Sequence, residues 1–229
     1  MRSRQLAVTT LVAATLGASM ASGAAGASPT GIAVTHSGVA HAAHFVTDGV
    51  NRLQTCYAQL DDDNGLGVVS QNFETAYNDY DSRGADDFYL QSACQVRRVD
   101  VVGEYFSGPG PADSANVTLY RDFNGAPGGV ITNQENLTAV GDGTGSFRIT
   151  LTTGVGLAPG RYFVSVQINM DLDPAGEWSW RTNDTARGIR ALWRNKSDGF
   201  GTGCVHYTRL TRCIHGGEGR DFAFAIVGS

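Results

Sequence analysis

The residues best suited to chemistry are aromatic and hydrogen-bonding side chains in the C-terminal part of the chain. The candidate ligand-binding set comprises Glu177, Trp178, Trp180, Arg181, Trp193 and Tyr207. Because successive side chains of a strand point to opposite faces, Trp178 and Trp180 share one face. Extracellular β-sandwiches hold sugar rings on aromatic faces flanked by polar groups, since sugar C–H faces stack on indole rings and hydroxyls need fixed partners. This pattern predicts a carbohydrate site.

A competing interpretation places the two tryptophans in the core, where large aromatic residues at strand spacing usually lie. In that case the opposite face of the strand, with Glu177, Ser179 and Arg181, is exposed and supplies the polar ligand contacts. The glycine-rich segment 198–220 is a second candidate surface, because loops held on a rigid scaffold often carry binding residues.

Two short acidic segments are candidates for a structural calcium site. The candidate ligands are Asp61, Asp63, Asp86 and Asp87. The first segment is not an EF-hand, because Gly65 takes the fifth position and Asn72 the twelfth, where a bidentate glutamate is needed. Calcium bound by an acidic loop at the edge of the fold is therefore an expectation, and a solvated turn is the alternative.

Motifs of catalysis are scarce. After the first 27 residues the chain has neither a G-x-S-x-G nucleophile elbow nor an H-E-x-x-H zinc motif. A glycosidase needs two carboxylates across a cleft, for which Glu104 and Glu177 are one pair among many. The sequence therefore predicts a non-catalytic protein.

Alternating apolar and polar residues indicate the strands that position these side chains. Residues 147–151 and 162–170 each show a period of two, and Pro159-Gly160 marks the turn between them, so we expect a hairpin. Similar short segments recur from residue 86 to 228 without crossover helices. This order predicts an all-β, antiparallel β-sandwich of about ten strands, jelly-roll-like in topology.

The N-terminal residues indicate export. Arg2 and Arg4 precede an apolar stretch that ends in small residues, so we expect residues 1–27 to be a signal peptide. Residues 28–55 are expected to form a flexible leader, and residues 56–229 the β-sandwich domain. No later stretch is apolar and long enough to span a bilayer, so no stable membrane insertion is expected after cleavage.

Charge and cysteine content agree with an extracellular location. Without residues 1–27 the chain holds 15 basic and 22 acidic residues, a balance that argues against nucleic acid as a partner. The even number of cysteines favours disulfides, with Cys204–Cys213 and Cys56–Cys94 as the preferred pairs among three possible connectivities. A zinc site is the alternative, although no C-x-x-C spacing is present.

Several motifs together resemble a group of secreted bacterial β-sandwich domains without assigned activity. They are Ser70–Glu74, Ala85–Phe88, Gly108–Pro111, Ala126–Gly128, Leu157–Gly160 with Tyr162, Trp178-x-Trp180 and Gly199–Cys204. The likeness covers about residues 56 to 228 and implies a jelly-roll-like, non-catalytic module that shares the Cys204–Cys213 pair. Cys94 departs from the pattern, so the Cys56–Cys94 pair depends on counting alone. The resemblance assigns no functional residue.

Together these features predict a secreted, extracellular binding module whose partner is a polysaccharide or the cell envelope. A structural or protein-interaction module of the envelope or matrix is the second hypothesis, and a glycoside hydrolase the third. Exposed aromatic residues would favour the first hypothesis, whereas a broad apolar patch that drives self-association would favour the second.

We expect the exported protein to begin at Ser28, because the small residues Ala25 and Ala27 suit cleavage after position 27. Intact-mass measurement of protein recovered from the medium of a bacterial host checks this expectation. A product that keeps residues 1–27 would contradict the signal-peptide interpretation.

Overall fold

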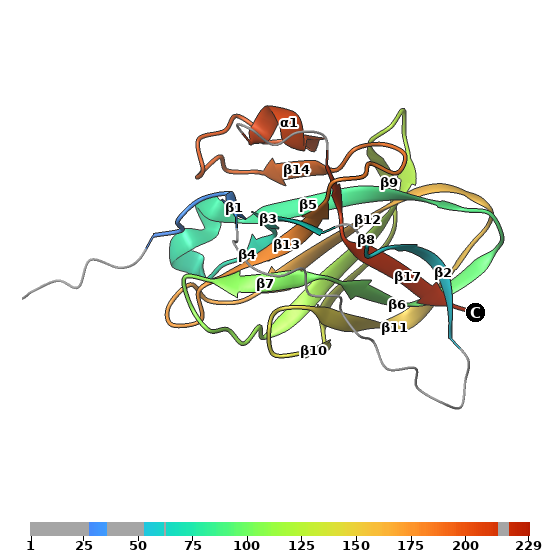
Figure 1. The fold of residues 1–229 in the computed structure, drawn as a ribbon, viewed down its shortest axis with the longest axis horizontal. Coiled ribbons are helices and arrows are strands. Elements are labelled where there is room, and N and C mark those ends of the chain that lie inside the picture. Colours follow the sequence, from blue (N-terminus) through green and yellow to red (C-terminus); the bar gives the residue numbers. More distant parts are fainter. Residues whose placement is uncertain (1–27, 36–52, 62, 215–219) are drawn as a thin grey trace, which may run out of the picture.

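The structure, a computed structural model, describes residues 28–35, 53–61, 63–214 and 220–229 (Figure 1). Within these residues the chain is mainly β-strand, with a 3₁₀ helix at Thr75–Tyr80 and one short helix, α1, at Leu210–Cys213. The fold is all-β with antiparallel sheets, as predicted, apart from one parallel pair, and the strands are more numerous than the ten or so expected. The expected signal peptide and most of the expected leader lie outside the described residues.

The strands form three sheets. The first contains β1 (Ala33–Thr35), β3 (Asp63–Val69), β13 (Glu177–Asn183) and β16 (Asp221–Phe222), with β7 (Gly103–Phe106) also on β13. The second runs in the order β10 (Ala139–Gly141), β11 (Phe147–Leu157), β6 (Cys94–Val101), β17 (Phe224–Gly228) and β2 (Gln54–Gln59). The third runs β15 (Thr208–Arg209), β14 (Leu192–Asn195), β5 (Ser82–Leu90), β12 (Gly160–Asn169), β8 (Ser114–Asp122) and β9 (Pro127–Leu137), with β4 (Gln71–Asn72) parallel to β12.

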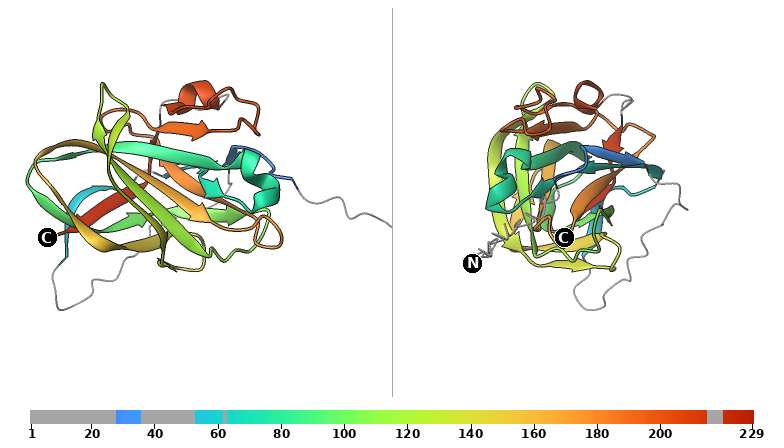
Figure 2. Two further views of the ribbon diagram at one scale, coloured as in Figure 1. Left: turned by 180° about the vertical axis from the view of Figure 1, so that it is seen from behind. Right: turned by 90° about the vertical axis from the view of Figure 1, so that its left-hand side faces the viewer.

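The first two sheets join into one layer. Val102 alone separates β6 from β7, and Ala223 alone separates β16 from β17. The Val102 amide donates to the Ala223 carbonyl (3.1 Å), the Ala223 amide to the Arg181 carbonyl (2.8 Å), and the Arg181 amide to the Val102 carbonyl (2.9 Å). Backbone pairing therefore continues across the junction, and this joined layer faces the third sheet (Figure 2).

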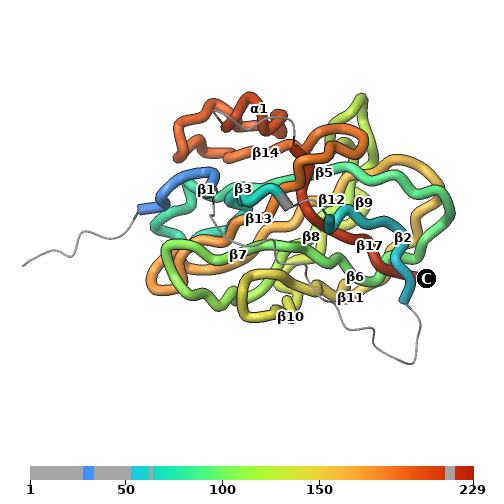
Figure 3. Tube along the Cα trace, in the orientation of Figure 1, coloured from blue at the N-terminus to red at the C-terminus, as the bar shows by residue number. Residues whose placement is uncertain are grey.

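Apolar side chains from both layers meet in one core, as the period-two patterns predict. On β12, Val164, Val166 and Ile168 point inward and are fully buried, whereas Ser165 and Gln167 occupy the outer face of the third sheet. From the joined layer the core receives Val99, Val101, Ile149, Trp178, Trp180, Phe222, Phe224 and Ile226. The tube view in Figure 3 shows β17 running between β2 and β6, with the C-terminus at the end of the sandwich.

The expectation of a hairpin at residues 147–170 is wrong. Both strands form, but β11 pairs with β6 and β10, whereas β12 pairs with β5 and β8. The Pro159-Gly160 turn therefore carries the chain from one layer to the other. Alternation shows which face of a strand is buried, and it does not show whether two consecutive strands lie side by side or face each other across a core.

Two glycines leave room for the tryptophan rings: Gly84 on β5 of the facing sheet, and Gly103 on β7 in the same sheet as Trp178. A Cβ atom on Gly84 would lie 2.7 Å from the Phe222 ring and 3.2 Å from Trp180. A Cβ on Gly103 would lie 2.5 Å from the Trp178 indole. Both glycines lie in strands, and the space that a side chain would need is filled by aromatic rings.

We expect Gly84→Ala to lower the free energy of unfolding by about 1–3 kcal/mol, the usual cost of overpacking a dense core. Gly129→Ala on β9 is the matched control, because no atom lies within 4 Å of its added Cβ. Urea unfolding of both variants measures the difference. An unchanged midpoint for Gly84→Ala would show that the two layers are not tightly packed at this point.

Candidate functional site

The three predicted tryptophans lie in the core and not on a ligand-binding surface. Trp178, Trp180 and Trp193 each have 0% exposed surface. Their indole N–H groups donate to the backbone carbonyls of Gly145 (2.7 Å), Ala223 (2.9 Å) and Val69 (2.7 Å), in that order. The expectation of a tryptophan platform for sugars is therefore corrected, because a buried ring with its N–H already bonded has no face left for a ligand.

The opposite face of β13 is also buried, which corrects the second expectation for this strand. Glu177 accepts hydrogen bonds from the Thr30 amide (3.0 Å) and hydroxyl (2.6 Å), and Arg181 donates to Glu104 (2.7 Å). All seven residues of β13 are buried. In the β7–β13 pairing Glu104 lies opposite Ser179, and Glu177 lies opposite Phe106. The two carboxylates are therefore on neighbouring strands of one sheet and not on opposite walls of a cleft.

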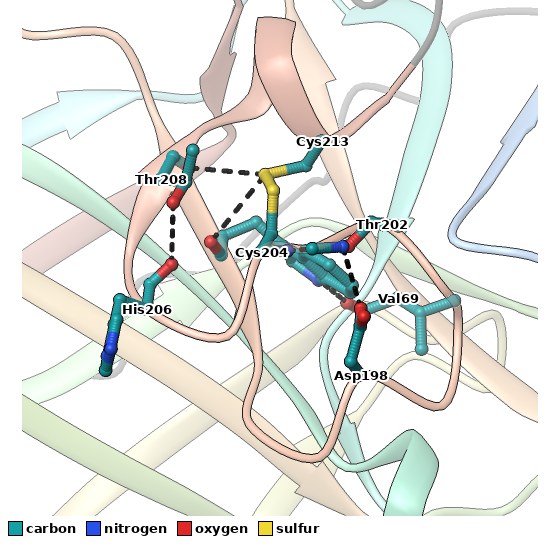
Figure 4. Close-up of a disulfide and its surroundings, with 9 residues drawn as sticks. Val69, Asp198, Thr202, Cys204, His206, Thr208 and Cys213 are labelled. Carbon is teal, nitrogen blue, oxygen red and sulfur yellow. Dashed lines mark hydrogen bonds between the residues drawn. A yellow bond between two sulfur atoms is a disulfide. The ribbon is translucent and has the colours of Figure 1, made fainter.

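Tyr207 lies on the outer face of the third sheet, where its ring centroid is 6.0 Å from that of the buried Tyr120. Its hydroxyl donates to the Ser165 hydroxyl (3.1 Å), and the Arg194 guanidinium lies 4.6 Å from its ring centroid. The Cys204–Cys213 disulfide holds the loop that carries Tyr207 (Figure 4). The six predicted ligand-binding residues are therefore divided between the core and this outer surface, and they do not form one site.

The second predicted disulfide, Cys56–Cys94, also forms and ties β2 to β6. Beside it opens a cleft with a volume of about 600 Å³. Its walls come from β2, the end of β5, the following turn, β12, the segment around residue 188 and the C-terminal residue. The lining residues are Gln54, Thr55, Cys56, Tyr57, Asp87, Tyr89, Gln91, Ser92, Ala93, Arg161, Arg187, Gly188 and Ser229.

Buried carboxylates lie at and behind the floor of this cleft. Asp87 accepts a hydrogen bond from the Ile189 amide (2.6 Å) and pairs with Arg161. Its neighbour Asp86 points the other way, into the core, and accepts from Gln59 (2.9 Å) and from the Phe222 amide (2.6 Å). Two adjacent aspartates on one strand are thus held by N–H donors on both sides of the sheet.

Burial dominates the electrostatics of these groups. Loss of hydration raises the pKa of Asp87 to about 6, although the Ile189 amide and the Arg161 guanidinium counteract it. Burial and the nearby charge of Asp221 raise the pKa of Asp86 well above its usual value. Burial also raises the pKa of Asp221, which lies close enough to repel both neighbours. The cleft floor therefore contains carboxyl groups that hold protons more tightly than in water.

The predicted calcium ligands do not form an ion site in the described part of the chain. The oxygens of Asp86 and Asp87 face N–H donors, and Asp61 forms a two-point ion pair with Arg187 (2.8 and 2.9 Å). The Asp63 side chain lies outside the described residues. Elsewhere in the described ranges, no three His, Cys, Asp or Glu residues cluster as metal ligands do. Calcium needs several oxygen atoms directed at one point, which this arrangement does not offer.

Sequence reasoning singled out only Asp87 and Cys56 among the cleft residues. It missed Tyr57, Tyr89, Arg161 and Arg187, because they come from four separate segments that meet only in the folded protein. One feature of the sequence could have pointed to this cleft: the predicted Cys56–Cys94 disulfide, which places β2 next to the start of β6.

No protein-family model matches the chain, and a search of curated proteins finds no match. The resemblance to secreted β-sandwich domains therefore stays a prediction. Among the described residues, no helix has the length and apolar character needed to cross a membrane.

We expect the protein to be more stable at pH 5 than at pH 7.5. The pKa of Asp87 is about 6 in the folded protein and about 3.8 in the unfolded chain, so the folded state binds this proton more tightly. The resulting stabilisation is fully present below pH 3.8 and is lost as the pH rises through 6. Asp86 and Asp221 act in the same direction. Urea unfolding at both pH values should show a smaller pH effect in Asp87→Asn. An equal pH effect in that variant would contradict the role of Asp87.

Proposed function

We propose that this protein is a secreted, non-catalytic module that binds a polar glycan of an extracellular polysaccharide or the cell envelope. The observation that carries the proposal is the cleft beside Cys56–Cys94, which places an exposed tyrosine ring among hydrogen-bonding side chains on a rigid scaffold. Binding sites of this kind combine apolar contact area with a few fixed polar groups.

Tyr89 supplies the aromatic surface. It is 54% exposed at the end of β5, and Tyr57 lines the cleft from β2. Gln54, Gln91 and Ser92 add amide and hydroxyl groups, which suit the many hydroxyls of a sugar. A tyrosine ring in this position can take the stacking role that the sequence suggested for tryptophan.

The charges of the cleft are balanced. Arg161 pairs with Asp87, and Arg187 pairs with Asp61 beyond the cleft wall. The two arginines keep about a third of their side-chain surface exposed and can still donate to a ligand (32% each). Because each positive charge has a nearby negative partner, an uncharged polar ligand fits better than a strongly charged one.

The wider assignment depends on the same proposal. The disulfides are compatible with an oxidising, extracellular location. Secretion through the signal peptide and a jelly-roll topology complete the proposed description of the module.

A protein-interaction module is the second candidate, supported by the edge strand β9. This strand has 11 residues and pairs only with β8 among the described strands. Val130 on β9 and Phe123 in the turn that leads into it are exposed (59% and 68%). An unpaired edge with apolar side chains is a suitable surface for another protein.

Binding to a panel of polysaccharides and cell-wall preparations tests both candidates, with the chain from residue 28 as the protein. We expect Tyr89→Ala to weaken retention at least about tenfold, because an aromatic residue at the centre of a site often contributes more than 1.4 kcal/mol. Phe123→Ala, which removes an exposed ring that does not line the cleft, should leave retention unchanged. No retention of the wild-type protein on any glycan would refute the proposal. Self-association or protein capture that Phe123→Ala abolishes would support the second candidate.

A further inference from the structure

A second polar hollow lies on the outer face of the third sheet, at the other end of β5 from the cleft. Its volume is about 220 Å³. The lining residues are Asn72, Asp81, Arg83, Gln167, Arg194 and Lys196. The two sites share no lining residue, and on β5 Arg83 is four residues, or about 13 Å at 3.3 Å per residue, from Asp87 of the cleft beside Cys56–Cys94.

Three of these residues are cations: two lie on paired strands, and Lys196 lies in the turn directly after β14. Arg83 on β5 lies directly opposite Arg194 on β14. Side chains at such positions point to the same face, with about 4.5–5.5 Å between their Cβ atoms. Lys196 follows two positions after Arg194 and is exposed. Like charges placed directly opposite each other destabilise a sheet, so this pairing opposes the folded state.

The structure compensates these cations only in part: the Asp81 carboxylate attracts Arg83, and Arg194 lies over the Tyr207 ring. Within the described ranges, neither Arg83 nor Arg194 has a carboxylate within ion-pair distance, and Asp81 is the one acid that lines the hollow. One carboxylate oxygen of Asp81 already accepts the Phe73 amide (2.8 Å). With three cations and one acid, the hollow has a local charge of about +2, whereas the whole chain is acidic at −5.

The surrounding residues hold the positive groups in place. The guanidinium of Arg194 lies 4.6 Å from the Tyr207 ring centroid, and the disulfide between Cys204 and Cys213 fixes the Tyr207 loop. Gln167 donates to the carbonyls of Gln71 (3.2 Å) and Ser82 (3.0 Å), which forms a fixed floor. The hollow is therefore preformed, and a ligand does not have to organise it.

We propose that this hollow binds the phosphate group of an anionic ligand, with Arg83, Arg194 and Lys196 as its cationic contacts. A phosphate has oxygens in several directions and suits donors that converge from two strands. Asn72 also lines the hollow, and its side-chain amide is a further N–H donor for the same oxygens. The ligand relieves the repulsion between the paired arginines, so binding and folding stability are coupled. Free phosphate and a phosphate ester of an envelope polymer share this chemistry.

Calorimetry and thermal unfolding of the chain from residue 28 test the proposal, with inorganic phosphate, glycerol 3-phosphate and a glycerol phosphodiester as probes. Sodium chloride at equal ionic strength controls for screening. We expect at least one probe to bind and to raise the Tm by about 3 °C or more at ten times its Kd. Binding of the esters but not of inorganic phosphate would identify a polymer ester as the source, and the reverse would identify the free ion.

Two variants separate binding from general stability. Arg83→Gln should weaken probe binding at least tenfold while its Tm without probe equals or exceeds that of the wild type, because a like-charge pair has been removed. Lys196→Gln, at an exposed position that tolerates substitution, should weaken binding without loss of fold. Arg121→Gln, an exposed arginine on β8, is the matched control and should bind as the wild type does. The proposal is overturned if no probe binds, if sodium chloride gives the same rise in Tm, or if both hollow variants bind like the control.

Discussion

The packing of Trp178 and Trp180 between the layers is the constraint on which the rest of the structure depends. The two rings lie 6.5 Å apart, and Trp180 stacks on Phe222 at 4.4 Å. The Trp180 N–H bonds to the carbonyl of Ala223, the residue at which the chain passes from the first sheet to the second. One indole therefore fills the core and also stabilises the junction that joins two sheets into one layer.

The two polar sites differ in how they handle charge. In the cleft beside Cys56–Cys94, each charged side chain has a partner, and buried carboxyl groups are supported by backbone amides. On the outer face of the third sheet, cations lie side by side with one acid among them. A balanced site favours neutral polar ligands, whereas an unbalanced site favours anions. The same β5 strand contributes to both sites, through Asp87 and Tyr89 at one end and Arg83 at the other.

The sequence predicted the fold class, both disulfides and the inward faces of the main strands. Period-two patterns and cysteine count report on burial and proximity, which are local or nearly local properties. The path between layers was not predictable, because the turn before Gly160 fits a hairpin and a crossing equally well. The burial of the tryptophans could not be predicted from the neighbouring sequence either. Alternation shows that the two side chains share a face of the strand, but whether that face is buried depends on the third sheet, which packs against it.

The clefts required the folded structure because their residues are distant in the chain. Tyr57 and Arg161, for example, meet only when β2 and β12 occupy opposite layers at the same end of the sandwich. Arg83 and Arg194 are ordinary surface residues in the sequence, and their juxtaposition appears only in the strand register.

The place of β17 has a consequence for the order of events during synthesis. Residues 224–228 lie between β6 and β2 in the second sheet, and residues 221–222 pair with β13 in the first. Until the ribosome has added these residues, β2 has no partner in the second sheet and the joined layer has a gap. The joined layer is therefore completed only after residues 221–228 have been synthesised, so the strands made earlier wait for this segment before β2 and β6 are linked.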